Sequence, residues 1–441
     1  MSRVTRPRAR LFSRRRVAFG LGALAISLLA IRLLIIPPSS RIVLPGKSAP
    51  SIPNVVLVYP PIPDNTLFRH GAELAAAEVQ AAGGIGDFRL HSEMVAQDAA
   101  DPNARLETLV AQTMTQAADI AKQENLLAVI GYVSADRAMS ASSVYDRAGV
   151  PYLATHAKST DLTSLGFQQV FALQCNYADD AKVLARYARR AGLKRFVVLS
   201  ENNNSGQELS RTFIRSASER GATILYNAEL GTHFPTTERL LLYLLDNKSF
   251  SANDIDAFFV ASNDYEANID LITRAHSLGL NVPIMGSAGF LAGDIEKRLG
   301  PALMKGLTVT STYAGAATEP AAAAFVGSFE STYGRQPDLY SAIGYDAVKL
   351  LAHAVTVAGK ADRHLISDAL RGLRFRSPFV GVTGAMNFDN LGRITNRPMF
   401  VFRHDGVAFR KVATFEHSCA DDTPANGQVP GPGNERMEPM P

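Results

Sequence analysis

The stretch from residue 126 to residue 153 constrains the fold of this chain most, because its pattern changes from strand to loop to helix to strand. Leu126 to Ile130 is a continuous apolar run, short enough for a strand that is buried on both faces. Gly131 interrupts the run, and Ser134 is a favourable N-cap for the helix that follows. Apolar residues then recur at helical spacing, and Val150 to Leu153 predicts the next strand.

The loop of residues 132–136 is the first candidate binding site. It follows the carboxyl end of a predicted parallel strand and opens a helix, and open α/β sheets bind ligands in that crevice. The hydroxyl of Ser134 and the backbone N–H groups of Ala135 and Asp136 favour an anion such as a carboxylate. The alternative is an ordinary connection in which Ser134 only caps the helix.

The rest of the chain repeats strand and helix units with short connections. Strands are expected at 54–59, 88–96, 126–130, 150–153, around Phe171, and at 195–199, 223–226, 257–261, 282–285 and 307–312. Helices are expected between them, at 66–82, 104–123, after Ser134, and at 177–191, 208–220, 237–245 and 265–278. Such alternation is typical of parallel, doubly wound sheets, so the fold class is α/β.

The late part of the chain adds helices at 321–333, 342–357 and 364–373, and then a hairpin-like pair of strands, Gly384 to Phe388 and Met399 to His404. Two strand–helix series with late segments that return to both predict two similar lobes joined by several crossings. Such a molecule has a cleft that closes on a ligand.

The amino-terminal residues indicate export or membrane anchoring. Residues 1–16 hold seven arginines and no acidic residue, and residues 17–36 are an apolar run broken only by Arg32. This pattern predicts a cleaved signal peptide or a signal anchor, with residues 1–16 in the cytoplasm and the chain after the Pro/Ser linker, residues 37–53, outside. A buried cytosolic helix is the alternative. Without the seven arginines the formal charge of +4 becomes −3, so we expect no nucleic-acid partner.

The sequence favours neither a metal site nor an enzyme. The motifs HExxH and Walker A are absent, residues 286–289 do not match G-x-S-x-G, and the nine histidines lack metal-ligand spacing. The two cysteines, Cys175 and Cys419, have no CxxC spacing. A disulfide is permitted outside the cytoplasm, but Cys419 lies in a Pro- and Gly-rich segment, residues 416–441, that we expect to be disordered. We therefore expect two unpaired thiols and no cofactor.

A set of short motifs recurs in the order and spacing of one protein family. The motifs are Gly83-Gly84-Ile85-Gly86, Asp98 with Asp101-Pro102, Val129-Ile130-Gly131 with Ser134, Gly149-Val150-Pro151, Tyr333-Gly334 with Pro337-Asp338, Tyr340 to Leu350, Phe379-Val380-Gly381 with Thr383-Gly384, and Phe388-Asp389 with Gly392. Over residues 54–412 the chain resembles the type I periplasmic binding proteins of the leucine/isoleucine/valine-binding family.

The resemblance implies a domain of residues 54–415 in which two lobes are joined by a multi-strand hinge. Lobe 1 is expected at about 53–174 and 313–374, and lobe 2 at about 175–312 and 375–414. The implied function is that of a non-enzymatic receptor, which holds an amino acid or related carboxylate between its lobes and delivers it to an ABC permease.

The resemblance also assigns candidate ligand-binding residues in the first lobe. Family members hold the ligand's carboxylate with hydroxyls and backbone N–H groups of that lobe. On this chain the corresponding positions are Ser134-Ala135-Asp136 and, at the next strand end, Ala157-Lys158-Ser159. Lys158 either pairs with the ligand's carboxylate or points to solvent.

In the second lobe, the family's glutamate for the ligand's ammonium corresponds to Ala288. Asp264, at the end of the preceding strand, is the candidate replacement. It is alternatively the N-cap of the helix that begins at Tyr265, and one residue can do both. Tyr177 and Tyr265 are candidate cleft residues, with core packing as the alternative.

Two other functions stay open. A membrane-tethered sensor is favoured by residues 17–36 if this segment is not cleaved. A cell-envelope interaction protein is favoured by the changes at Ala135 and Ala288.

Overall fold

The computed structural model describes residues 53–59, 66–84, 89–94, 106–132, 134–232, 234–291, 295–315, 320–416, 418–419 and 435–437. The basic segment, the apolar run and all of the linker except residue 53 lie outside these ranges. Among the described residues, no helix combines the length and the apolar character needed to cross a membrane.

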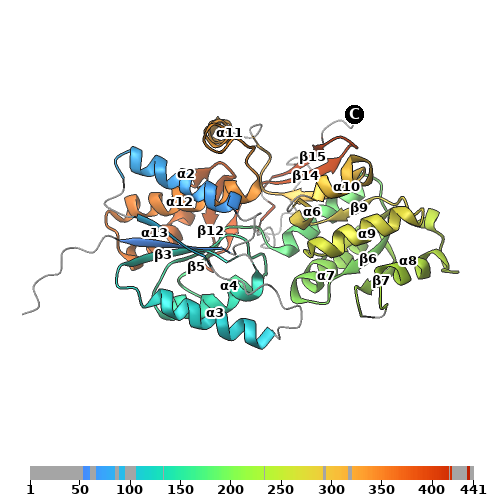
Figure 1. The fold of residues 1–441 in the computed structure, drawn as a ribbon, viewed down its shortest axis with the longest axis horizontal. Helices are drawn as coiled ribbons and strands as arrows, with labels where there is room; N and C mark the ends of the chain where they lie inside the picture. Colours follow the sequence, from blue (N-terminus) through green and yellow to red (C-terminus); the bar gives the residue numbers. More distant parts are fainter. Residues whose placement is uncertain are drawn as a thin grey trace, which may run out of the picture. The chain divides into compact units, whose positions relative to one another are not determined.

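The first sheet, within the described residues, has five parallel strands in the spatial order β2-β1-β3-β4-β5 (Figure 1). The strands are Asn54–Tyr59 (β1), Arg89–Met94 (β2), Leu126–Gly131 (β3), Tyr152–Ala154 (β4) and Val170–Ala172 (β5). The strand order reverses between β1 and β3. The carboxyl ends of these two strands therefore form the position at which open α/β sheets bind ligands.

Alternating side chains of this sheet build one apolar core on each face. Val55 and Leu57 pack with α2, α12 and α13, whereas Val56 and Val58 pack with α3 and α4. The helices around this sheet are Thr66–Ala81 (α2), Leu106–Ala121 (α3), Ala135–Arg147 (α4), Asp161–Ser164 (α5), Pro320–Tyr333 (α11), Leu339–Ala358 (α12) and Arg363–Gly372 (α13). The late helix α12 lies along the early helix α2 (Figure 1).

The second sheet, in the described part of the chain, has the order β16-β15-β14-β10-β9-β8-β6-β7. The strands from β10 to β7 are parallel, and β14, β15 and β16 extend the sheet in antiparallel fashion. Their bounds are Arg195–Ser200 (β6), Thr223–Glu229 (β7), Ala257–Ala261 (β8), Ile284–Gly286 (β9), Thr308–Ser311 (β10), Met399–His404 (β14), Phe409–Phe415 (β15) and Glu435–Met437 (β16).

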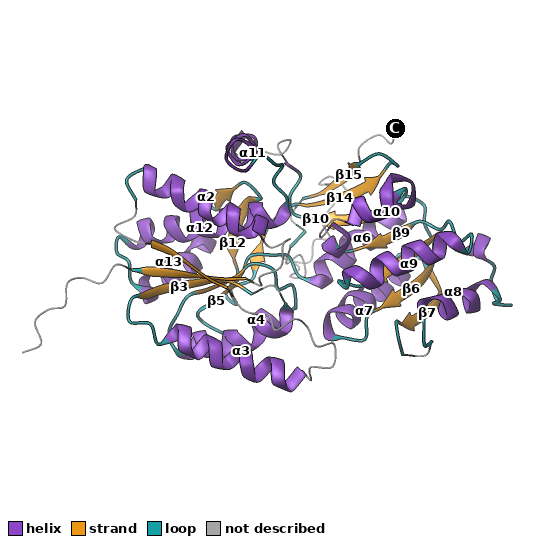
Figure 2. Ribbon diagram, viewed as in Figure 1, coloured by secondary structure: helices purple, strands orange, loops and turns teal. Residues whose placement is uncertain are grey.

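Helices cover both faces of the second sheet as well (Figure 2). Phe196 and Val198 pack with α6 and α7, whereas Val197 and Leu199 pack with α8, α9 and α10. These helices are Tyr177–Arg190 (α6), Asn204–Glu219 (α7), Thr237–Leu245 (α8), Tyr265–Ser277 (α9) and Ile295–Met304 (α10). The chain passes between the two sheets after β5, after β10 and before β14. The predicted fold class, two doubly wound α/β lobes with several crossings, is confirmed.

The closing strands differ from the prediction. Gly384 to Phe388 (β12) and Met399 to His404 do not form a hairpin, because β12 pairs with Phe379–Gly381 (β11) and Ile394–Thr395 (β13), while β14 pairs with β10 and β15. Arg393 forms a parallel bridge with Ala172 of β5, which links this third sheet to the first sheet. The sheet was expected in lobe 2, and its assignment to a lobe stays a prediction.

A buried carboxylate of α12 holds this third sheet in place. Asp346 accepts hydrogen bonds from the backbone N–H groups of Val382 and Thr383, both at 2.8 Å, and from the Thr383 hydroxyl. A Cβ at Gly381 would lie 2.4 Å from the Asp346 carboxylate, so the approach requires glycine there. The turn between β11 and β12 is therefore fixed by a residue distant in sequence.

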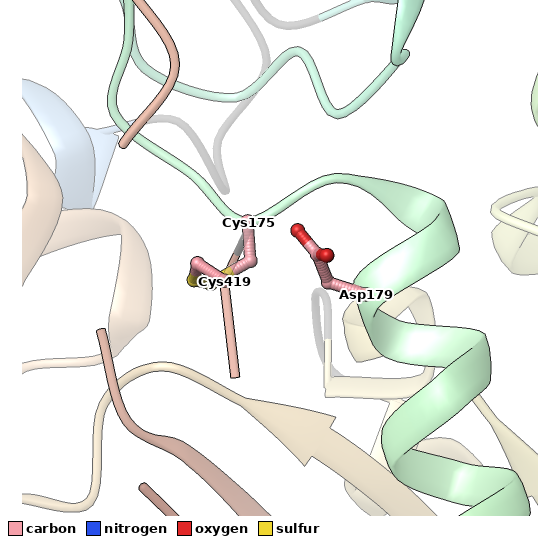
Figure 3. A group of neighbouring side chains, drawn as sticks. All are labelled: Cys175, Asp179 and Cys419. Carbon is pink, nitrogen blue, oxygen red and sulfur yellow. A yellow bond between two sulfur atoms is a disulfide. The ribbon is translucent and has the colours of Figure 1, made fainter. Parts of the chain in front are cut away.

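The cysteines are paired, which corrects the expectation of two free thiols. Cys175 and Cys419 form a disulfide with a Cα–Cα distance of 5.2 Å across 244 residues (Figure 3). The segment after β15 is placed by Ser418, whose N–H donates to the Arg397 carbonyl at 3.1 Å and whose hydroxyl donates to the Phe415 carbonyl at 2.9 Å. Within residues 416–441, which we expected to be disordered, Glu435–Met437 pairs with β15.

Opening the Cys175–Cys419 bridge should lower the free energy of unfolding by about 2–4 kcal/mol, the usual contribution of a native disulfide. The measurement is urea unfolding of the wild type and of Cys419→Ser, each with and without a reductant. Reductant should lower the wild-type midpoint and leave that of Cys419→Ser unchanged. Equal midpoints for oxidised wild type and variant would show that the bridge contributes nothing.

Candidate functional site

The first part of the site is the loop after β3. A Cβ at Gly131, whose φ is 138°, would lie 1.9 Å from the Val58 carbonyl oxygen, so β1 and β3 approach closely only with glycine there. Ser134 follows and caps α4, its Oγ accepting from the Arg137 N–H at 3.3 Å. In the described part of the chain, its hydroxyl hydrogen has no acceptor and is available to donate. The partly buried Ala135 and Asp136 form the first turn of α4, where backbone N–H groups have no intrahelical acceptor.

The second part is the loop after β4, where Lys158 forms an internal ion pair. Its Nζ bonds to the Asp180 carboxylate in the first turn of α6, and the two side chains are 13% and 1% exposed. The other Asp180 oxygen accepts from the Thr310 hydroxyl at 3.0 Å. Lys158 is thus paired inside the protein, whereas the two alternatives were a pair with the ligand's carboxylate and a side chain that points to solvent. Its neighbours differ in burial: Ala157 is buried, and the partly buried Ser159 accepts from the Asp161 N–H at 3.3 Å.

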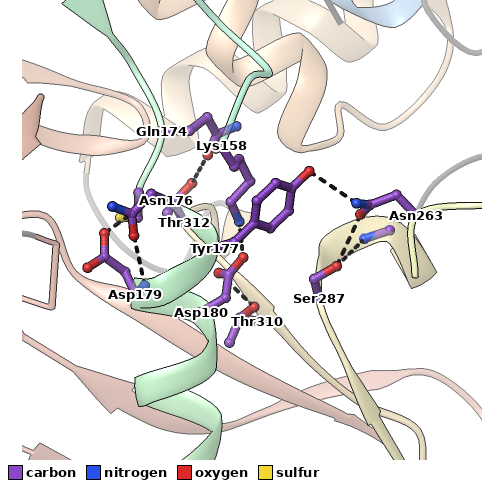
Figure 4. Close-up of polar contacts among 12 residues, drawn as sticks. Lys158, Gln174, Asn176, Tyr177, Asp179, Asp180, Asn263, Ser287, Thr310 and Thr312 are labelled. Carbon is purple, nitrogen blue, oxygen red and sulfur yellow. Dashed lines mark hydrogen bonds and ion pairs between the residues drawn. The ribbon is translucent and has the colours of Figure 1, made fainter. Parts of the chain in front are cut away.

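The third part is a chain of hydrogen bonds that joins α6 to the ends of β8 and β9 (Figure 4). The Asn263 Nδ2 donates to the Tyr177 hydroxyl at 3.0 Å, and the Ser287 hydroxyl donates to Asn263 Oδ1 at 3.2 Å. Burial, and next the negative charge of Asp180, raise the pKa of Tyr177. Tyr177 therefore stays a neutral hydroxyl with a hydrogen to donate.

A second ion pair joins α6 to the third sheet. Arg393 Nη2 contacts both oxygens of the buried Asp179, at 2.7 and 2.9 Å. Asp179 also accepts from the Asn176 N–H at 3.0 Å and so completes a capping box at the start of α6. Burial raises the pKa of Asp179, and the charge of Arg393 opposes this rise.

Asp264 and Tyr265 lie at the end of β8, as predicted, but both have local partners. Asp264 is exposed and caps α9 by accepting from the Ala267 N–H at 3.0 Å. The Arg298 guanidinium lies 5.2 Å from the centre of the Tyr265 ring. Ala288 begins a short 3-10 helix directly after Ser287.

Sequence reasoning missed several residues of the site. Glu201 directly follows β6 and accepts from the Asn263 N–H at 2.9 Å, and its pKa is raised by burial. Ser287 directly follows β9, and Asn263 is the second residue after β8. Their common signal was a polar residue within three positions of a strand end, which we applied in this lobe only to Asp264.

His156, the second residue after β4, was also missed. It is 8% exposed, and its ring stacks on Tyr340 at 5.0 Å between centroids and meets Phe68 edge-on at 4.7 Å. Its Nδ1 lies 2.7 Å from the Thr155 hydroxyl, and among the described residues its Nε2 has no hydrogen-bond partner. Burial lowers the pKa of His156 to about 3, so the ring is neutral near neutral pH.

One group of side chains has a metal-like arrangement but is already engaged. Ligand atoms of Cys175, Asp179 and Cys419 lie within 4.8 Å of one another. Both sulfurs are in the disulfide, however, and the Asp179 carboxylate is paired with Arg393. This group therefore does not fit a metal ion.

Removing either partner of the Lys158–Asp180 pair should destabilise the protein by about 3–5 kcal/mol, because an unpaired buried charge is left behind. We expect Lys158→Met and Asp180→Asn each to have this cost, and the double variant to recover much of it. In the double variant, the amide oxygen introduced by Asp180→Asn can still accept from Thr310. Denaturant unfolding of all four proteins gives the coupling energy, and additive losses would contradict a buried pair.

The neutral His156 should make stability depend on pH. Its pKa is about 3 in the fold against an ordinary 6.5, so between these values the unfolded chain binds a proton that the fold excludes. Stability therefore rises with pH across this window. At about 1.36 kcal/mol per pH unit, His156 removes roughly 2 kcal/mol between pH 6.5 and pH 5.

The check is urea unfolding at these two pH values. His156→Gln should lose less stability on acidification than the wild type, since glutamine does not titrate. Identical losses would show that His156 is not kept neutral.

Comparisons with known proteins place these features in context. Residues 63–408 match the family model described as periplasmic binding protein. The leucine-, isoleucine-, valine-, threonine- and alanine-binding protein of Pseudomonas aeruginosa is 23% identical over 336 residues, which are 76% of this chain and 84% of that protein. The Leu/Ile/Val-binding protein homolog 7 of Brucella abortus is also 23% identical, over 72% of this chain and 79% of its own length.

Solved structures with the same fold include two with different bound ligands. The ABC transporter substrate-binding protein of Desulfitobacterium hafniense in complex with Leu has a TM-score of 0.69 and 26% identity, covering 82% of this chain and 99% of that one. A solute-binding protein of R. palustris in complex with benzoate has a TM-score of 0.68 and 18% identity, covering 83% and 96%.

Proposed function

Because the chain belongs to the periplasmic binding protein family, whose relatives include leucine/isoleucine/valine-binding proteins, we propose that it is an extracytoplasmic solute receptor. It binds a small carboxylate between its two sheets and delivers it to an ABC permease. The relatives are binding proteins, which is consistent with a non-enzymatic chain.

The observation that carries this proposal is the loop after β3. Ser134 offers a hydroxyl hydrogen, and the first turn of α4 offers N–H groups without an acceptor among the described residues, at the reversal point of the strand order. A carboxylate is the group that leucine and benzoate share, and these are the ligands bound by the two solved neighbours. A carboxylate at α4 thus agrees with both.

A membrane-tethered sensor is the second candidate. The apolar run of residues 17–36 favours it, since an uncleaved run would hold the binding domain at the membrane. Mass spectrometry of the exported protein distinguishes the two: loss of the run supports a free receptor, and its retention supports a tethered one.

Ser134→Ala should weaken carboxylate binding about tenfold or more. A hydrogen bond to a charged group contributes roughly 1.5–3 kcal/mol, and about 1.4 kcal/mol is one decade in affinity. Binding is measured by calorimetry on the purified protein, after a thermal-shift screen of amino acids and aromatic acids has found a ligand.

Thr236→Ala is the matched control, because Thr236 caps α8 with the same geometry, accepting from the Arg239 N–H at 3.2 Å. Both variants lose a cap worth about 1 kcal/mol of stability, but only Ser134→Ala should lose affinity. Equal affinities for the two variants would remove Ser134 from the site.

A further inference from the structure

The unpartnered nitrogen of His156 points to a ligand contact that the candidate residues did not include. A buried polar atom without a partner costs about 1–3 kcal/mol, so it needs an explanation. His156 lies in the loop between β4 and Lys158, and β4 is the neighbour of β3, whose loop the proposed function uses. The inference below rests on that function and names the class of ligand.

The hydrogen bond to Thr155 determines which nitrogen of His156 carries the proton. If the fully buried Thr155 hydroxyl donates to Nδ1, the proton is on Nε2, and only the Nε2–H lacks a partner. If Nδ1–H donates to the Thr155 oxygen instead, two groups lack a hydrogen-bond partner: the Thr155 hydroxyl hydrogen and the Nε2 lone pair. The first arrangement leaves fewer groups unsatisfied, so Nε2 is a buried donor that requires an acceptor.

The acidic groups around the strand ends are engaged within the protein and offer little negative charge to a ligand's ammonium group. Asp180 is paired with Lys158 and Asp179 with Arg393, while the exposed Asp264 caps α9. The Glu201 carboxylate accepts from the Asn263 N–H, and the Glu208 carboxylate accepts from the Thr160 N–H; burial raises the pKa of both. These acids therefore favour a ligand without a cationic group.

The surroundings of His156 are aromatic. Phe68 and Tyr340 contact its ring, and Tyr177 lies at the start of α6 with the Lys158 ammonium 5.8 Å from its ring centre. Planar apolar groups pack well among such rings.

We infer that His156 donates its Nε2–H to the carboxylate of the bound ligand, and that this ligand is an aryl carboxylic acid without an α-ammonium group. The carboxylate then meets the hydroxyl of Ser134 or the N–H groups of α4 with its other oxygen. The neutral state of His156 suits this role, because the ring donates a hydrogen bond without adding a charge to the site.

Two pairs of probes separate the features of the ligand. 3-Phenylpropionate and phenylalanine share a carbon skeleton and differ in the ammonium, and benzoate and cyclohexanecarboxylate differ in the aromatic ring. Calorimetry should show binding of the aryl acids, with phenylalanine and cyclohexanecarboxylate at least tenfold weaker than their partners. Tighter binding of phenylalanine or leucine would overturn the inference and leave the proposed receptor function intact. Binding of none of these carboxylates would overturn both.

Two variants test the contact itself. His156→Phe keeps a ring between Phe68 and Tyr340 but removes the donor, so it should weaken binding of the best aryl acid at least tenfold. His404→Phe is the control, because His404 is another buried histidine packed on an aromatic ring, that of Phe409, in the second sheet. It should leave affinity unchanged.

His156→Gln, which can place an amide N–H near the lost nitrogen, should restore part of the affinity. Nitrogen-15 spectra of the wild-type imidazole give a readout that packing alone does not change. They should show Nε2 protonated and its resonance shifted on ligand binding. An unshifted Nε2, or full affinity in His156→Phe, would overturn the contact even if the phenylalanine variant folds poorly.

Discussion

Two neighbouring carboxylates buried in the first turn of α6 set the constraint on which the rest of the structure depends. Asp179 and Asp180 are each 1% exposed, and charges at that depth are tolerated only with a partner. Arg393 reaches Asp179 from the third sheet, and Lys158 reaches Asp180 from the loop after β4. One helical turn therefore holds together the two lobes and the small sheet, and the strand-end residues of the candidate site are arranged around it.

The fold class was predictable because it follows from local patterns. Alternation in a strand such as β1, with Val55 and Val56 on opposite faces, requires helices on both sides of the sheet, and the sequence shows those helices. The partners of the late strands were not predictable in this way. Gly384 to Phe388 and Met399 to His404 are neighbours in sequence but lie in different sheets. Hydrogen bonds to Asp346 hold the turn before the first strand, whereas the second strand pairs with the edge of β10. Pairing is decided by distant groups that a local pattern does not contain.

The helix caps in the candidate site were predictable, because Ser134 and Asp264 are polar residues that lie between a strand end and a helix start. The partner of Lys158 was not predicted, because Asp180 comes 22 residues later and faces it only after α6 has packed. His156 was missed because a buried histidine at a strand end resembles ordinary core packing in a sequence. Its significance depends on an unsatisfied nitrogen, which is visible only when every neighbouring donor and acceptor is known.

The redox state of the Cys175–Cys419 pair is an indicator of folding in this protein. Cys175 precedes the α6 cap, whereas Cys419 follows every described strand except β16, and Ser418 beside it is positioned by Arg397 and the end of β15. Contacts between residues so far apart form late, particularly in mostly parallel sheets. The bridge therefore requires residues that are 244 positions apart to meet, and the oxidation state of the two thiols reports whether they have done so.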